Sequence, residues 1–101
     1  MRESDAQAFR LIMQHRTMLA AYVRAIVRSP ELAEDTLGDV SVEIARCWDA
    51  YDPSRPFGAW ARGVARRVAL ANLRRHGAQP ALLDEEVLER VGAKIEAISA
   101  A

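Results

Sequence analysis

The chain has 101 residues, half of them hydrophobic, and its 14 basic and 14 acidic side chains give a formal net charge of zero. This length suffices for one small domain and excludes a multidomain enzyme. A single cysteine, Cys47, excludes an internal disulfide framework. No apolar run approaches the roughly 20 residues of a membrane span. Charged residues also open the chain where a signal peptide would become apolar, so we expect a soluble, cytoplasmic protein that does not use a membrane.

The neutral total is made of four segments of alternating sign. Residues 1–28 carry a charge of +3 and residues 29–54 a charge of −6, because seven acids there meet a single arginine. Residues 55–76 hold six arginines and no acid, and residues 77–101 carry −3. An all-arginine segment beside an acidic one indicates two different partners, one anionic and one a protein. The alternative is that opposite segments face each other across a pair of helices.

Hydrophobic periodicity predicts helices and no strand in the first half of the chain. The first helix is expected from residue 5 to residue 28, with a capping box that begins at Ser4. A second helix should begin at Pro30, with Ser29 as its N-cap. Along this helix a row of acids spaced by four residues lies off the apolar stripe and is expected to face solvent or a partner.

The second half of the chain predicts two further helices. Pro56 should lie in the first turn of a helix that ends at Gly77, whose arginines are displayed outside its apolar stripe. A linker over residues 77–82 leads to a last helix of about fifteen residues with Asp84 as its N-cap. The expected fold is therefore all-α, a compact bundle of three main helices plus a C-terminal helix.

Candidates for catalysis are few. His15 and His76 are the only histidines, and neither has a cysteine or carboxylate at ligand spacing, so no metal site is expected. The chain has no glycine-rich phosphate loop and no nucleophile elbow. We therefore expect a binding protein without a cofactor, and not an enzyme.

Residues 31–75 contain a set of motifs that resembles a known family. They are Ala33-Glu34-Asp35 with Asp39 four residues later, Trp48, Phe57-Gly58-Ala59-Trp60-Ala61, Val64-Ala65-Arg66 and the closing Arg74-Arg75. With these motifs the chain resembles region two of the extracytoplasmic-function sigma factors. These are the small promoter-recognition subunits of bacterial RNA polymerase, within the sigma-70 family. Weaker similarity reaches back to Phe9 and forward to Glu86.

The resemblance implies a sigma region 2 helical domain over residues 1–78, followed by a linker and C-terminal helix over residues 79–101. In transcription initiation its second helix would dock on the clamp-helix coiled coil of the largest polymerase subunit. Its third helix and the preceding loop would hold the melted non-template strand of the minus-ten promoter element. An anti-sigma factor is a further partner that the resemblance admits. The residues implied for polymerase binding are Asp35, Asp39, Glu43 and Arg46, and those implied for DNA binding are Tyr51, Arg55, Arg62, Arg66, Arg67 and Arg74.

The chain departs from the family pattern at several positions. Gly38, Ser41 and Ala45 stand where the family has glutamine, an aromatic residue and tryptophan, so docking on the polymerase is expected to be weaker. Arg67 replaces an asparagine, which adds phosphate affinity and removes a base contact. The position of Trp60 on the helical wheel favours core packing over base stacking.

Nothing after residue 83 has the length of region four, the domain that reads the minus-thirty-five element. The chain is therefore expected to be an excised fragment or a reduced homologue. Two other functions fit the same residues. One is a helical protein-interaction module that keeps the acidic helix, and the other is a general basic nucleic-acid binder that works without polymerase. A salt titration on single-stranded DNA separates these two, because only the second would bind with salt dependence.

Overall fold

Six helical elements account for the computed structural model, which describes residues 2–81 and 84–99. No strand occurs among these residues, which confirms the all-α prediction. None of the helices described there is long and apolar enough to cross a membrane. In chain order the elements are α1 (Glu3–Gln14), α2 (Arg16–Ile26), α3 (Pro30–Arg46), the short 3₁₀ helix η1 (Trp48–Ala50), α4 (Phe57–Arg75) and α5 (Glu85–Ser99).

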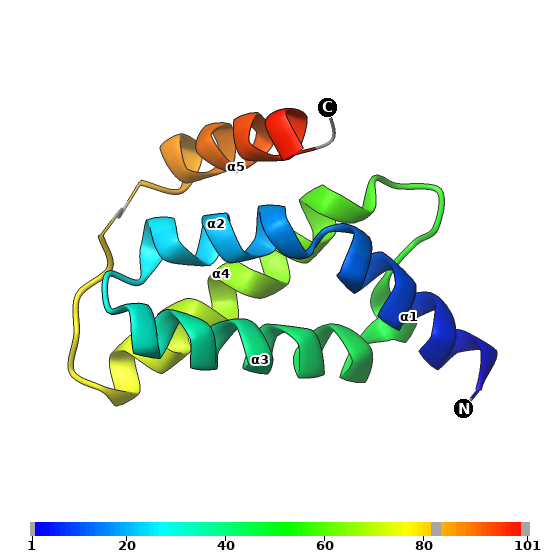
Figure 1. The fold of residues 1–101 in the computed structure, drawn as a ribbon, viewed down its shortest axis with the longest axis horizontal. Coiled ribbons are helices and arrows are strands. Elements are labelled where there is room, and N and C mark those ends of the chain that lie inside the picture. The colour runs from blue at the N-terminus through cyan, green and yellow to red at the C-terminus, as the bar shows by residue number, and fades with distance from the viewer. Residues whose placement is uncertain (1, 82–83, 100–101) are drawn as a thin grey trace.

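Helices α2, α3 and α4 form the centre of the bundle. As Figure 1 shows, α5 lies along the side of α2 that faces away from α3, and α4 crosses behind α2. Helix α1 extends beyond the other three toward the N-terminus and contacts α3. The C-terminal helix is therefore an outer layer on the bundle, in contact with α2 and α4.

The N-terminal helix is broken at His15, so the prediction of one helix over residues 5–28 is wrong. His15 has φ −106° and ψ 11°, outside the helical range. Its backbone N–H donates to the carbonyls of Leu11 and Ile12, and its ring Nδ1 lies 2.9 Å from the Leu11 carbonyl oxygen. Side-chain bonding of this kind competes with the helical hydrogen-bond ladder. The imidazole also packs on the ring of Phe57, with centroids 4.9 Å apart, and this long-range contact accompanies the break.

Ser29 and Asp84 cap α3 and α5 as predicted. The Ser29 hydroxyl accepts a hydrogen bond from the backbone of Leu32 at 3.2 Å. The Asp84 carboxylate accepts two backbone N–H bonds from the first turn of α5, at 2.9 and 3.1 Å. The predicted capping box at Ser4 does not form, because α1 already begins at Glu3 and no side chain caps it.

The apolar core lies where α2, α3 and α4 meet. Ala61, Ala65 and Ala69 of α4 are fully buried, and their small side chains let α4 approach its neighbours closely. Larger side chains, most of them from α2 and α3, fill the remaining space. The largest fully buried hydrophobic side chains are Met18, Leu19, Tyr22, Val23, Ile26, Val27, Val40, Ile44 and Val64.

The connection that leaves α4 is held against the end of α2. Gly77 has φ +64°, a left-handed conformation that favours glycine at a helix end. The N–H of Ala78 donates to the Leu73 carbonyl at 2.9 Å, and that of Ala81 donates to the Ile26 carbonyl at 2.8 Å. The second of these bonds brings the chain beside α2 before α5 begins.

Replacing Ile44 by alanine tests the core, because this α3 side chain is fully buried. We expect Ile44→Ala to lower the free energy of unfolding by about 2–5 kcal/mol, since it removes buried methyl and methylene groups and leaves a cavity. The matched control is Val42→Ala on the same helix, where the side chain is 57% exposed. Its effect should be about 0.5 kcal/mol or less. Urea unfolding followed by circular dichroism measures both, and equal losses would contradict this core.

Candidate functional site

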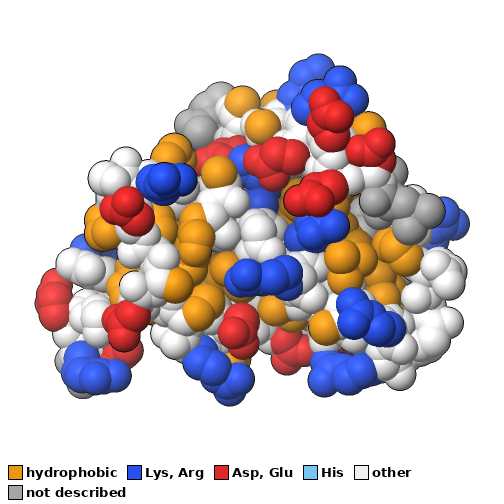
Figure 2. Space-filling model, turned by 180° about the vertical axis from the view of Figure 1, so that it is seen from behind, with side chains coloured by type: hydrophobic (Ala, Val, Ile, Leu, Met, Phe, Trp, Pro, Cys, Tyr) orange, Lys and Arg blue, Asp and Glu red, His pale blue; other side chains and the backbone are white. Residues whose placement is uncertain are grey.

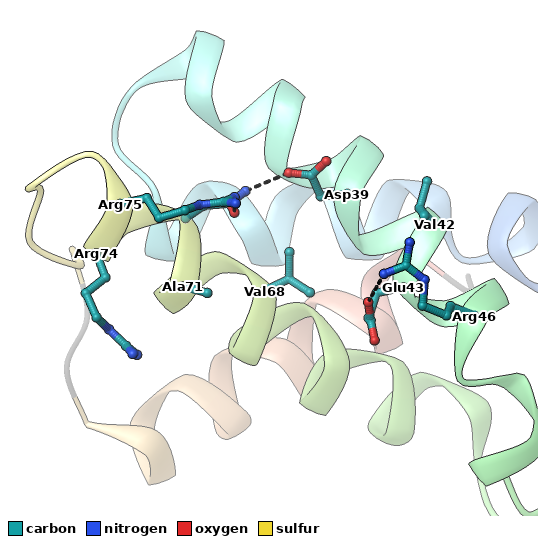
Figure 3. A pocket seen from close by; sticks show the side chains of 9 residues that line it. Asp39, Val42, Glu43, Arg46, Val68, Ala71, Arg74 and Arg75 are labelled. Atoms are coloured by element: carbon teal, nitrogen blue, oxygen red, sulfur yellow. Dashed lines mark hydrogen bonds and ion pairs between the residues drawn. The ribbon is translucent and has the colours of Figure 1, made fainter.

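An open hollow of ≈ 580 Å³ lies between α3 and α4 (Figure 3). The acidic side chains around it come from α3, and two arginines come from the C-terminal half of α4. Arg46 of α3 is close to Glu43 one turn earlier, with 3.7 Å between the guanidinium and the carboxylate. The hollow therefore combines charges of both signs. It is lined by Asp39, Val42, Glu43, Arg46, Val68, Ala71, Asn72, Arg74 and Arg75.

Asn72 joins the two sides of this hollow by buried hydrogen bonds. Its Nδ2 donates to the Thr36 hydroxyl at 3.0 Å and to an Asp39 carboxylate oxygen at 2.9 Å. Its side-chain oxygen accepts a hydrogen bond from Arg75. Asn72 and Thr36 are almost completely buried, so these groups would be costly to leave unpaired. The sequence reasoning missed Asn72, although a polar residue four positions after Val68 on the inward stripe was a usable signal.

The residues implied for polymerase binding lie along one side of α3. Asp35, Asp39 and Glu43 follow one another at intervals of four, which stacks them turn upon turn. Asp35 and Asp39 are exposed and Glu43 is half-buried. The structure brings Asp39, Glu43 and Arg46 together at the hollow, and Asp35 lies one turn before it, outside its lining.

Four aromatic rings gather where η1 and the loop after it meet the start of α4. The ring centroid of Tyr51 lies 5.0 Å from that of Trp60, 5.2 Å from that of Trp48 and 5.6 Å from that of Phe57. The Tyr51 hydroxyl donates to the Arg55 carbonyl at 2.7 Å, which ties the two ends of the loop together. Trp60 is half-buried and packs against the core, as its wheel position predicts.

Asp52 shapes the same loop. One of its carboxylate oxygens accepts a hydrogen bond from the Ser54 backbone at 3.0 Å and another from the Ser54 hydroxyl at 2.8 Å. These bonds favour the charged carboxylate and hold the pKa of Asp52 below its ordinary value. The exposed guanidinium of Arg55 lies 3.8 Å from the other oxygen. The loop is thus organised by its own side chains.

Arg62 is buried, so the prediction that it is displayed on the outer face of its helix is wrong. Only 4% of its side chain is exposed. Its Nη2 lies 2.7 Å from a Glu89 carboxylate oxygen, and its Nη1 pairs with Glu96. Burial by itself would lower the pKa of Arg62, but the hydrogen bonds and charges of the two glutamates outweigh burial and raise it. The predicted stripe of α4 is also incomplete, because Arg62 shares its side of the helix with Ala65 and Ala69, which are fully buried, and α5 covers the end of its side chain.

The arginines implied for DNA binding fall on two sides of α4. Arg62 and Arg66 are one turn apart and both face α5, where Arg66 lies 3.5 Å from a Glu85 carboxylate oxygen. Arg67 and Arg74 are two turns apart on another side, and both are exposed. Arg62 and Arg66 therefore face acids of the next charge segment across a pair of helices. For these two arginines the alternative interpretation of the charge segments is correct.

The sequence of this chain matches the model of a known protein family. The model of the family described as sigma-70 region 2 matches residues 11–79, about two thirds of the sequence. The match begins within α1, includes α2, α3 and α4, and ends in the connection before α5. No curated protein and no solved structure gave a significant match to the chain.

Replacing Asn72 by leucine tests the bridge between α3 and α4. We expect Asn72→Leu to lower the free energy of unfolding by about 1–3 kcal/mol, because it removes the partner of the buried Thr36 hydroxyl. Adding Thr36→Val to this variant removes that hydroxyl, so the double variant should recover part of the loss. Urea unfolding of the three proteins measures the coupling, and strictly additive losses would contradict the bridge.

Proposed function

Because the chain belongs to the sigma-70 region 2 family, whose regions take part in RNA polymerase binding and promoter melting, we propose that it is region two of an extracytoplasmic-function sigma factor. The observation that carries this proposal is the family match over the bundle of α1 to α4. The assignment to the extracytoplasmic-function group is supported by Trp48 and by the motif from Phe57 to Ala61. A sigma factor region regulates transcription and is not catalytic, and it acts where the polymerase is, in the cytoplasm.

The acidic side of α3 is the proposed polymerase-binding surface. Asp35 and Asp39 are exposed there, so they are accessible to a partner that presents basic side chains. Asn72 already holds the Asp39 carboxylate in one orientation, which reduces the side-chain entropy lost on docking. Glu43 and Arg46 extend the surface along the same helix. The proposed partner is the clamp-helix coiled coil of the largest polymerase subunit.

Two positions on α3 explain why we expect this docking to be weak. Gly38 offers no side chain, and a Cβ built there would meet nothing within 4 Å. The Ser41 hydroxyl bonds its own helix, at 3.1 Å from the Leu37 carbonyl oxygen. Neither residue adds apolar area to an interface, and buried apolar area is the main source of binding free energy.

The loop after η1 and the adjoining side of α4 form the proposed DNA-binding surface. Arg55, Arg67 and Arg74 are exposed, and Tyr51 is the aromatic ring of the loop. Basic side chains beside an aromatic ring are what single strands require, since phosphates bind the cations and bases stack on rings. The proposed ligand is the melted non-template strand of the minus-ten element. Arg62 and Arg66 belong to the proposed set but are paired with α5 in this structure.

A protein-interaction module without promoter use is the second candidate. The observation that favours it is the pairing of Arg62 and Arg66 with glutamates of α5, which removes two of the arginines from the basic surface. Such a module would keep the acidic side of α3 and show no salt-dependent DNA binding. An anti-sigma factor is a partner that either function admits.

Reversing the charge of Asp35 tests the polymerase-binding surface without disturbing the Asn72 bridge. We expect Asp35→Arg to weaken capture of a polymerase clamp fragment about tenfold or more, because like charges then oppose each other across the contact. The control is Asp49→Arg, which makes the same charge change at an exposed residue of η1 outside this surface. Pull-down with purified fragment measures both, and circular dichroism checks folding. Undiminished capture by Asp35→Arg would remove α3 from the polymerase contact.

Removing one exposed arginine tests the DNA-binding surface. Arg67→Ala should lower the slope of log affinity against log salt by about 0.7 for single-stranded DNA, the value of one phosphate contact. Arg28→Ala serves as control, because Arg28 is also exposed but lies after α2, outside the proposed surface. Fluorescence anisotropy with a labelled minus-ten-like oligonucleotide gives the slopes. The same slope for the parent and Arg67→Ala would exclude a phosphate contact at this residue.

A further inference from the structure

Helix α5 lies outside the segment matched by the family model and is rich in acids. It carries four of the five acidic residues of the segment 77–101. In Figure 1 it runs along the top of the bundle, and Figure 2 shows acidic and basic side chains side by side at the top of the molecule, seen from behind. Helix α5 also carries Arg90 and Lys94, so its four glutamates leave it with a net charge of −2.

Three of the four α5 glutamates bind arginines of α4. Glu89 and Glu96, two turns apart, both bind the guanidinium of Arg62. Glu85 lies 3.5 Å from Arg66. Arginine binds carboxylates and phosphates through the same fork of N–H groups, so the ligands that α5 supplies resemble those of a phosphodiester backbone.

The fit between α5 and the bundle is close at Gly92. A Cβ built at Gly92 would come within 2.5 Å of the Arg62 Cδ and 2.9 Å of the Tyr22 Cδ1, too near for any side chain without movement. One turn earlier, Leu88 is buried to 3% exposure in the same contact. The helix thus occupies a shaped seat, made of the side chains of Tyr22, Arg62 and Arg66.

We propose that this seat is a second binding site for the phosphates of single-stranded nucleic acid, and that α5 occupies it in the free chain as an intramolecular competitor. With α5 docked, Arg62 is buried and Arg66 is paired with Glu85. With α5 displaced, these two arginines add to the exposed Arg67 and Arg74. The inference rests on the proposed function, because it extends the DNA-binding surface of α4 to a second side.

The contacts allow an exchange of this kind. The side chains of Glu89 and Glu85 are 51% and 73% exposed, so solvent reaches the carboxylates of these ion pairs, while the side chain of Arg62 is 4% exposed. The pair of Arg66 and Glu85 is accessible to solvent, so it contributes little and is screened by salt. The buried Arg62 needs a partner, and an entering phosphate would take the place of the glutamates. The buried Leu88 opposes release, which makes the docked state the main one. Because coupling between two ligands is reciprocal, DNA binding must loosen α5 as much as α5 weakens DNA binding.

The unmodified full chain provides the first test. Amide hydrogen exchange of residues 85–99 is measured with and without a saturating 20-nucleotide single-stranded DNA of mixed sequence. We expect the DNA to speed the exchange of α5 about tenfold, while the exchange of α3 stays the same or slows. Bound DNA with unchanged exchange in α5 overturns the proposal.

Forcing α5 out of its seat provides the second test. Gly92→Leu puts a side chain where a Cβ would come within 2.5 Å of the Arg62 Cδ, whereas the control Ala93→Leu places the same leucine side chain at an exposed position of the same helix. With the labelled 20-nucleotide strand, anisotropy should show about tenfold higher affinity for Gly92→Leu, as expected when a competing state is removed. Its salt slope should rise by about 1.4, the value of two phosphate contacts. Ala93→Leu should match the parent.

A second set of variants releases α5 without the risk that a bulky side chain prevents folding. Their results distinguish a failure of the proposed competition from a failure of the proposed DNA binding. Glu89→Gln with Glu96→Gln weakens the same contact without adding bulk, and Glu86→Gln is its control, since Glu86 is exposed at the start of α5. If the parent binds DNA and neither Gly92→Leu nor the double glutamine variant binds more tightly, the competition by α5 is wrong and the proposed function stands. If no variant binds DNA even when hydrogen exchange shows α5 released, the DNA-binding role itself is wrong.

Discussion

Ala61, Ala65 and Ala69 are fully buried on the side of α4 that faces α2 and α3, and their small size brings the three helices close together. Interiors are packed as densely as organic crystals, so a larger residue at any of these positions would push α4 outward. The close approach puts Asn72 within hydrogen-bond distance of α3. It also directs Arg62 away from α3 and toward the side where α5 lies. The charged surfaces of the protein therefore depend on where this apolar contact places α4.

Helix α4 has acidic helices on two sides, and it meets them in different ways. Toward α3 the contact passes through the neutral amide of Asn72, which leaves the exposed acids available to another molecule. Toward α5 the contact is direct, and it satisfies a guanidinium that is 4% exposed. A buried charge without a partner would be strongly destabilising. The chain thus neutralises the arginines on one side of α4 by itself and leaves those on the other side accessible.

This division gives the proposed sigma factor domain three surfaces, two that are accessible and preorganised and one that α5 covers. The acidic side of α3 is exposed and already oriented, as a preorganised protein-binding surface should be. The loop with Tyr51 is held by its own hydrogen bonds and aromatic contacts, so it too is preorganised. The basic side of α4 under α5 is occupied. DNA can bind there only if its contacts with the arginines are stronger than those that α5 already makes.

The sequence by itself determined the helices whose signals are local. Ser29 before Pro30 and Asp84 before an acidic turn are caps that act within a few residues, and both are confirmed. Spacing by four likewise placed Asp35 and Asp39 on one side of α3, because that relation is a property of a single helix. Only the tertiary structure decided the break at His15, which accompanies ring packing against a residue far along the chain.

The state of the arginines was also decided only by the tertiary structure. A helical wheel gives the direction in which Arg62 leaves its own helix, on a side that it shares with the fully buried Ala65 and Ala69. It contains no information on what lies there, and in the folded chain α5 does. The excess of acids in residues 77–101 allowed such a pairing without selecting the arginines that take part. Solvent exposure is a property of how helices pack on one another, and it can be read from a single helix only when no other helix covers it.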